Sequence, residues 1–256
     1  MTSRDPGFRD YLADFGVALA FYTRLPLPRF ASVEGGDIAR GSWAAPVAGA
    51  AVGLLGAMVY WIGHLTGLPP FLSAGLVLAA TLAVTGCLHE DGLADTADGF
   101  GGRDRVRKLE IMRDSRIGTY GVCALVLSLL LRAGALAAIA DPMLVAPALV
   151  AAHASARATL PMFMFLVPPA RRDGLSALAG RPPQASAISA AVLGLVALGL
   201  GLGLIRGLVA LLLIFLATGF MAWLCKKQIG GQTGDILGAL EQVNEIVILL
   251  VVASHV

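Results

Sequence analysis

Residues 71–99 of this chain read FLSAGLVLAATLAVTGCLHEDGLADTADG, an apolar run that changes abruptly into an acidic one. The first part has nearly the length and the composition of a membrane-spanning helix, which needs about 20 apolar residues. In the second part, Asp91, Asp95 and Asp98 follow one another at i, i+4 and i+7. On a helix these positions point within roughly 60° of one another, so that one face carries all three carboxylates. The stretch predicts a membrane helix that ends in a cluster of acids.

The composition places the whole chain among membrane proteins. Of the 256 residues, 57% are hydrophobic and only 14% are charged, and the mean hydropathy is +0.79. Soluble domains carry about 25% charged residues. These values exclude an ordinary soluble domain, and we expect the lipid bilayer, and no nucleic acid, as a partner.

Seven segments are long and apolar enough to be candidate spans. They are residues 43–65, 71–89, 118–140, 143–167, 186–205, 208–224 and 236–253. Residues 8–24 are too short to span, and we expect them to lie at the membrane interface or beneath the bundle. Continued through the acids, the second segment would form one helix over about 71–98, roughly 40 Å long. We predict an all-α, polytopic membrane helix bundle of about seven transmembrane helices plus an N-terminal interfacial helix, as a single domain over residues 1–256.

The distribution of basic residues orients this bundle. Sixteen of the 19 Lys and Arg residues fall before the first span or in alternate loops, among them Arg4 and Arg29 near the N-terminus. Because basic loops stay in the cytoplasm, we expect the N-terminus of this membrane protein to lie on the cytoplasmic side. Loops 89–117, 168–185 and 225–235 would then form an active-site face on the cytoplasmic side.

The acidic residues and the loop after them indicate a site for metal and phosphate. Crowded carboxylates repel one another, and acids at the C-terminal end of a long helix also oppose its dipole, so a cation should compensate them. Mg²⁺ takes carboxylate and phosphate oxygens. Downstream, Arg113 and Arg116 flank Asp114, and guanidinium groups bind phosphate oxygens. Gly118 and Gly121 would let the backbone approach a bulky ligand.

Two acids interrupt the last apolar segment. Glu241 and Glu245 lie four residues apart on one helical face. Carboxylates inside a membrane normally face the protein interior and have a partner, and Arg157, near His153, is a candidate counter-ion. These residues could equally serve as scaffold. For His89, beside the acidic motif, we favour a supporting role over metal ligation.

Four strings along the chain resemble the cobalamin-5'-phosphate synthase family, also called adenosylcobinamide-GDP ribazoletransferases. They are FYTRLP at 21–26, HEDGLADTADG at 89–99, EIMRDSR at 110–116 with GTYG at 118–121, and GGQTGD at 230–235. The resemblance implies a magnesium-dependent enzyme of the bacterial inner membrane. It would join adenosylcobinamide-GDP to α-ribazole, or to α-ribazole 5'-phosphate, and release GMP in the last stages of cobalamin synthesis. The resemblance is compatible with an oligomer and with other late-pathway enzymes as partners.

The resemblance also implies roles for particular residues. Asp91, Asp95 and Asp98 would hold Mg²⁺ and act in catalysis, with Glu90 as a further candidate ligand where some relatives are expected to have an apolar residue. The residues expected to bind substrate are Arg24, Arg113, Asp114, Arg116 and Asp235. We expect a ribose hydroxyl to attack the phosphorus on the cobinamide side of the pyrophosphate while one aspartate takes its proton, and Asp98 is one candidate for that role.

Two other functions fit parts of the pattern. CDP-alcohol phosphotransferases also carry aspartates at helical spacing, but after Asp91-Gly92 this chain lacks the Ala-Arg pair that their motif requires. A transporter could line a path with Glu241, Glu245, Arg132 and Arg157. It would be expected to show repeated halves, and the polar residues here gather in loops instead.

Overall fold

The computed structural model describes residues 8–26 and 35–254, and within these ranges the chain is all-α, as predicted. Arg4 and Arg29 lie outside the described residues. The helices are α1 (Phe8–Tyr22), α2 (Gly35–Gly41), a 3-10 helix η1 (Ser42–Ala44), α3 (Ala45–Leu65), α4 (Pro70–Thr85), α5 (Leu88–Phe100), α6 (Arg105–Ile111), α7 (Thr119–Ile139), α8 (Pro142–Leu166), α9 (Leu175–Ala179), α10 (Gln184–Leu202), α11 (Leu204–Ile229) and α12 (Gly234–Ala253).

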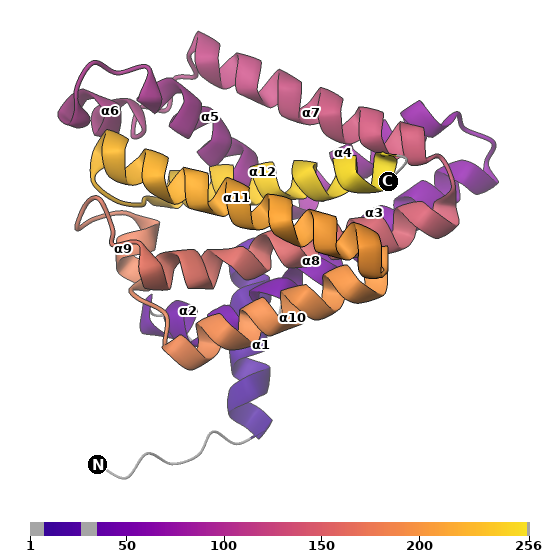
Figure 1. Cartoon of the computed structure of the whole chain (residues 1–256), viewed down its shortest axis with the longest axis horizontal. Helices are drawn as coiled ribbons and strands as arrows, with labels where there is room; N and C mark the ends of the chain where they lie inside the picture. The colour runs from indigo at the N-terminus through magenta and orange to yellow at the C-terminus, as the bar shows by residue number, and fades with distance from the viewer. Residues whose placement is uncertain (1–7, 27–34, 255–256) are drawn as a thin grey trace.

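The long helices form a bundle that suits a membrane. Six are long and apolar enough to cross on their own, and α4 with α5 gives a seventh if the pair is taken together. Figure 1 shows them running in one general direction, while the short α1 runs across it. The chain is a multi-pass membrane protein, and the predicted segments match these helices within a few residues except at α4 and α11. Helix α11 continues past the predicted end at 224, with Lys227 Nζ lying 4.9 Å from the Trp223 ring centre. Such side chains let a helix extend into the interface.

The predicted continuous helix over 71–98 is wrong. Gly86 (φ 63°) and Cys87 (φ 57°) both take the left-handed conformation, and α5 leaves α4 at 91°. Helix α5 therefore leaves the direction of α4 and packs along the spanning helices α7 and α12, where Glu90 of α5 meets Arg132 of α7. It also begins anew, so that Glu90 and Asp91 fall in its first turn. There the helix dipole favours negative charge, which removes the unfavourable arrangement that one long helix would have imposed.

Small residues bring the central helices into backbone contact. A Cβ added to Gly49 of α3 would lie 2.2 Å from His153 O of α8, and one added to Gly53 would lie 2.6 Å from Leu149 O. Gly194 of α10 is equally close to α8, since its Cβ would lie 2.5 Å from Ala158 Cβ. Close approach through small residues is typical of helices that pack in lipid. Helix α8 is thus held from two sides.

One end of the bundle gathers the loops and is called the motif end here. It carries α2, α6, α9 and the start of α12, and α5 runs toward it (Figure 1). Arg105 joins its loops, because Nε donates to Ile229 O (2.7 Å) and Nη2 donates to Ala170 O (2.6 Å). Gln232 N also donates to Pro168 O at 2.9 Å. Loops 89–117, 168–185 and 225–235 meet at this end.

Candidate active site

Helices α5 and α12 pack so closely that their acids become neighbours. An ideal Cβ on Gly92 would lie 2.8 Å from Asp235 O, and one on Gly238 would lie 3.0 Å from His89 O. This contact sets Asp91 and Asp95 of α5 beside Asp235 in the first turn of α12. Thr233 begins that turn, since its Oγ1 accepts from Ile236 N and lies 3.1 Å from Asp235 Oδ2.

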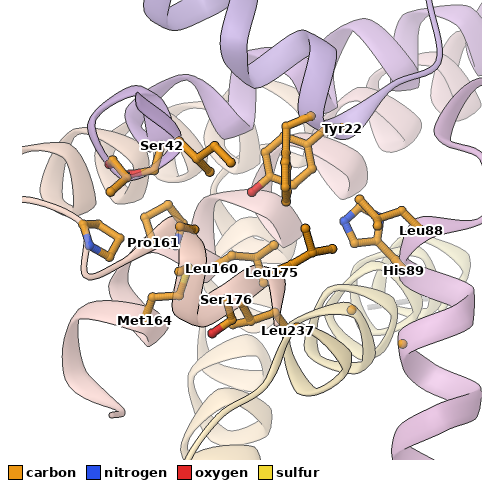
Figure 2. Close-up of a pocket in the computed structure, with 18 of the residues that line it drawn as sticks. Tyr22, Ser42, Leu88, His89, Leu160, Pro161, Met164, Leu175, Ser176 and Leu237 are labelled. Carbon is orange, nitrogen blue, oxygen red and sulfur yellow. The ribbon is translucent and has the colours of Figure 1, made fainter. Parts of the chain in front are cut away.

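Two cavities meet at these acids. The outer cavity, of about 510 Å³, is lined by acidic residues of α5 and by the loop after α6, including Glu90, Asp91, Asp95, Arg113 and Asp114. The inner cavity, of about 320 Å³, lies among α1, α2, α5, α8, α9 and α12 (Figure 2). Asp91 lines both cavities, and Asp235 lines the inner one. The carboxylates therefore stand between two spaces that small molecules can enter.

The carboxylates of this site repel one another. The negative charges of Asp91, Asp235 and Asp98 all act on Asp95. Arg171 offsets part of the charge, because its Nη2 lies 3.4 Å from Asp235 Oδ2. Its Nη1 is buried without a hydrogen-bond partner among the described residues. The site thus carries excess negative charge together with a guanidinium that still has a donor to offer.

Asp98 binds the start of α7. Its Oδ2 accepts from Gly118 N (2.7 Å) and its Oδ1 from Gly121 N (2.9 Å). The carboxylate thereby satisfies N–H groups that have no partner within the helix. Both glycines are needed for the contact, since a Cβ on Gly118 or Gly121 would come within 2.5 Å or 2.4 Å of the Asp98 oxygens.

The predicted arginines lie apart from one another. Arg113 Nη2 binds the Asp173 carboxylate (2.5 and 2.6 Å). Arg116 binds Asp114 (2.6 Å) and, by this hydrogen bonding, lowers the pKa of Asp114 to about 2. Both ion pairs are solvent-exposed, so each is weak and can yield to a phosphate. Arg24 packs against Gly86, where its Nε would lie 2.6 Å from an added Cβ.

Glu90 enters a buried ionic network. Its Oε1 accepts from Arg132 Nη1 (3.1 Å) of α7 and from Gln242 Nε2 (3.0 Å) of α12. The same Arg132 nitrogen donates to Glu245 Oε1 at 3.2 Å. Glu90 also lines the outer cavity, and its role as a magnesium ligand stays a prediction.

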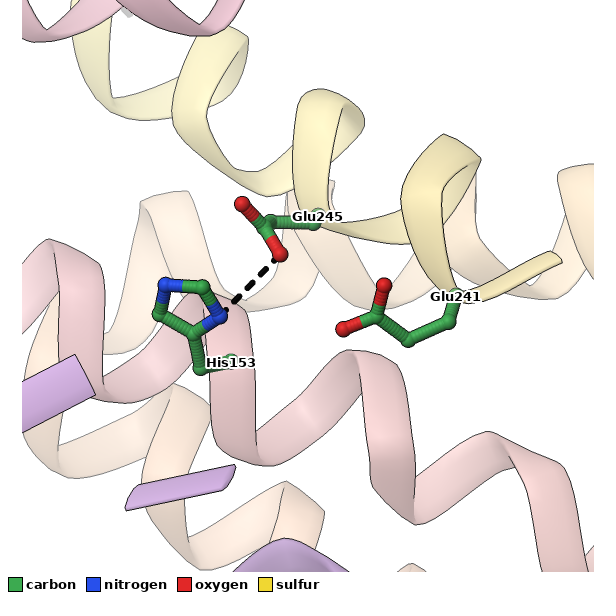
Figure 3. A group of neighbouring side chains, drawn as sticks. All are labelled: His153, Glu241 and Glu245. Carbon is green, nitrogen blue, oxygen red and sulfur yellow. Dashed lines mark ion pairs between the residues drawn. The ribbon is translucent and has the colours of Figure 1, made fainter. Parts of the chain in front are cut away.

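The rest of the network lies between α8 and α12. Arg157 Nη1 pairs with Glu241 Oε1 at 2.6 Å, which confirms the predicted counter-ion. His153 Nδ1 lies 3.1 Å from Glu245 Oε2, and Figure 3 shows His153 facing the two carboxylates. The ligand atoms of His153, Glu241 and Glu245 lie within 4.8 Å of one another, a spacing that a metal ion would accept. Because guanidinium groups already pair with both carboxylates, we interpret the cluster as an ion network that joins the helices.

Two features of the site were missed from sequence. Arg171 was counted only among the basic loop residues, although it lies against Asp235. The His89 ring stacks on Tyr22 of α1, with ring centres 5.8 Å apart and planes at 23°. Tyr22 lies in the string FYTRLP, which marks its position in the sequence. The string carries no information on the ring that Tyr22 stacks against.

Comparison with known proteins places this geometry in a family. Residues 14–253 match the family described as cobalamin-5-phosphate synthase. The chain belongs to the cobalamin-5-phosphate synthase family. Over 247 residues the chain is 60% identical to an adenosylcobinamide-GDP ribazoletransferase of Bradyrhizobium diazoefficiens. The match covers 96% of this chain and 95% of that protein.

Two further relatives carry the same name. That of Mesorhizobium japonicum is 55% identical (95% of this chain, 93% of the other), and that of Azorhizobium caulinodans is 46% identical (93% and 94%). No solved structure matches the chain. The family assignment covers the four strings singled out from sequence, including both acidic helices of the site.

The contact between α5 and α12 makes a sharp test of this site possible. We expect Gly92→Ala to lower turnover at least about 100-fold, because its Cβ would force α5 away from the Asp235 backbone and misplacement by about 1 Å can have that effect. Gly134→Ala on α7 is the matched control, since nothing lies within 4 Å of its Cβ. Equal activity of the two variants would show that the contact does not position the acids.

Proposed function

We propose that the protein is an adenosylcobinamide-GDP ribazoletransferase. It joins adenosylcobinamide-GDP to α-ribazole, or to its 5'-phosphate, and releases GMP. The observation that carries the proposal is the meeting of Asp91, Asp95 and Asp235 between two cavities, each with a mainly apolar wall that also holds an arginine. Two dissimilar substrates can thus approach one set of carboxylates from different sides.

We further propose that the site uses Mg²⁺. Asp91, Asp95 and Asp235 offer the hard oxygen donors that this ion prefers. The negative charges that surround Asp95, which Arg171 offsets only in part, support a bound cation here. Bound Mg²⁺ would supply Lewis-acid neutralisation of the pyrophosphate. Whether Asp98 and Glu90 join the ligands stays open to test, since their oxygens already accept hydrogen bonds from α7 and from Arg132 and Gln242.

The chain's own residues then have definite tasks. Arg113 leaves Asp173 to bind pyrophosphate oxygens, with Arg116 and Asp114 beside it in the same loop, while Arg24 supports the α4–α5 break. A carboxylate oxygen of Asp95 takes the proton of the attacking ribose hydroxyl as a general base. The new O–P bond forms on the cobinamide phosphate as the bond to GMP breaks. The guanidinium groups offset the charge on the departing phosphate.

The proposal includes a location. The basic residues of α6 and of the loops that flank α6 and α9 gather at the motif end, which by the positive-inside tendency faces the cytoplasm. We propose a bacterial inner-membrane protein with its N-terminus on that side. Association with other late-pathway enzymes and with further copies of the chain stays a prediction.

Turnover by the purified protein tests the function. In detergent or liposomes, with adenosylcobinamide-GDP, α-ribazole and Mg²⁺, we expect the corrinoid product and GMP in equal amounts. Removal of Mg²⁺ by chelation should reduce the rate at least about 100-fold, and added Mg²⁺ should restore it. Full activity after chelation would contradict the metal requirement, and absence of both products from folded protein would contradict the reaction.

A further inference from the structure

The inner cavity joins an apolar chamber to a charged mouth. Its chamber is walled by α8, α9 and α12, and Figure 2 shows the side chains around it, among them Leu160, Met164, Leu175 and Leu237. Its mouth holds Asp91, Asp235 and Arg171. A ligand that fits it must be apolar at one end and polar at the other.

The chamber offers few polar atoms to a ligand, and one of them is His89 Nε2, which is buried without a hydrogen-bond partner among the described residues. Ser42 Oγ donates to Ala39 O (2.8 Å), and Ser176 Oγ donates to Gln232 Oε1 (2.5 Å). Tyr22, stacked on His89, adds a hydroxyl to the wall. A base with many hydrogen-bonding groups would therefore lose more hydrogen bonds to water than these few atoms can replace, which is unfavourable. A flat apolar ring with a single acceptor nitrogen suits the chamber.

The mouth suits a ribose or its phosphate. Arg171 Nη1 is buried there without a hydrogen-bond partner among the described residues, so it has a donor free for an oxygen of the ligand. Asp91 connects the mouth with the outer cavity. A hydroxyl held at the mouth would lie next to the acids that the proposed reaction uses.

From these features we infer that the inner cavity binds the benzimidazole nucleoside, α-ribazole, with its base in the chamber and its ribose at the mouth. The inference rests on the proposed function. The volume of about 320 Å³ lies at the lower end of the range of ligand pockets and cannot hold a corrinoid. Guanine, with several donors and acceptors, matches the apolar wall poorly.

A pair of variants on α8 tests the inference. Met164 lines the inner cavity, whereas Met162, two residues earlier, lines an apolar groove formed with α10 and α11. We expect Met164→Trp to raise the KM for α-ribazole at least about tenfold and to leave the KM for adenosylcobinamide-GDP within twofold. Met162→Trp should leave both unchanged. Leu175→Trp, at an exposed side chain of the same cavity, repeats the test if Met164→Trp does not fold.

Binding of α-ribazole alone, followed by equilibrium dialysis without the corrinoid, separates this inference from the proposed function. We expect wild type to bind it, 5,6-dimethylbenzimidazole to compete and guanosine not to compete. If wild type turns over but the cavity variants change only the KM for the corrinoid, or neither KM, the cavity assignment is overturned and the function stands. If wild type makes no product, the proposed function fails. Loss of α-ribazole binding in Met164→Trp would in that case still support the cavity assignment. If wild type does not bind α-ribazole, the cavity assignment is overturned.

Discussion

Asp91→Asn is expected to lower turnover by about 1,000-fold or more while leaving the fold intact. The substitution keeps the size of the side chain but removes the charge of the residue that lines both cavities. Loss of one preorganised electrostatic contact commonly lowers kcat by 10²–10³, and loss of a metal ligand adds to this. Because Asp91 is solvent-exposed, its loss should have little effect on stability. Turnover and thermal unfolding measured on the same preparation check both expectations.

Asp141→Asn provides the control for this variant. Asp141 lies at the opposite end of α8 from the motif end, and its Oδ1 accepts from Met143 N at 2.9 Å. An asparagine oxygen can accept the same hydrogen bond. The same chemical change should therefore leave turnover and stability near the wild-type values. If Asp91→Asn retained more than about a tenth of the activity, Asp91 would not be the central carboxylate of the site.

Arg132→Met is expected to have the largest effect on stability. Arg132 has a side chain only 1% exposed and pairs with Glu90 and Glu245. Methionine fills similar space but leaves two buried carboxylates without their cation, which costs about 3–5 kcal/mol. For a chain of this length we expect Tm to fall by about 6–20 °C. Thermal unfolding in detergent measures the fall, and turnover should decline with it because Glu90 adjoins Asp91.

Two further variants separate charge from packing at Arg132. Adding Glu90→Gln and Glu245→Gln to Arg132→Met removes the unpaired charges, so part of the lost Tm should return. Arg103→Met is the surface control, because the Arg103 side chain is 90% exposed and its pair with Asp104 is long (3.4 Å); its Tm should stay within about 2 °C. A triple variant no more stable than Arg132→Met would show that the effect comes from lost packing rather than charge.

The long helices could be predicted because lipid imposes a simple condition on sequence. A spanning segment must be apolar over its length, and charges within it must find partners. The pairing of Arg157 with Glu241 followed from that second condition. The break after Thr85 could not be predicted in the same way, since the left-handed backbone of Cys87 leaves no trace in hydropathy, and a non-glycine residue rarely adopts it.

Most residues of the candidate site could be predicted from the sequence, but their arrangement in space could not. Spacing correctly placed Asp91 and Asp95 near one another, but it treated Asp98 as their equal. Asp98 binds the start of α7, 20 residues further along the chain. Nothing in local spacing shows which of several carboxylates will meet another helix. The contact of Arg171 with Asp235 likewise depends on how the loops at the motif end fold together.

The ionic network also bears on how the protein assembles during synthesis. Chains are made from the N-terminus, so α8 enters the bilayer carrying Arg157 before α12, which brings its carboxylate partner Glu241, exists. A guanidinium in the hydrocarbon region is costly until it is paired. Arg132 meets Glu90 earlier, but Glu245 again arrives only with α12. The last helix thus neutralises charges that earlier helices have carried into the membrane, and the bundle reaches its stable state only when the C-terminal segment has been inserted.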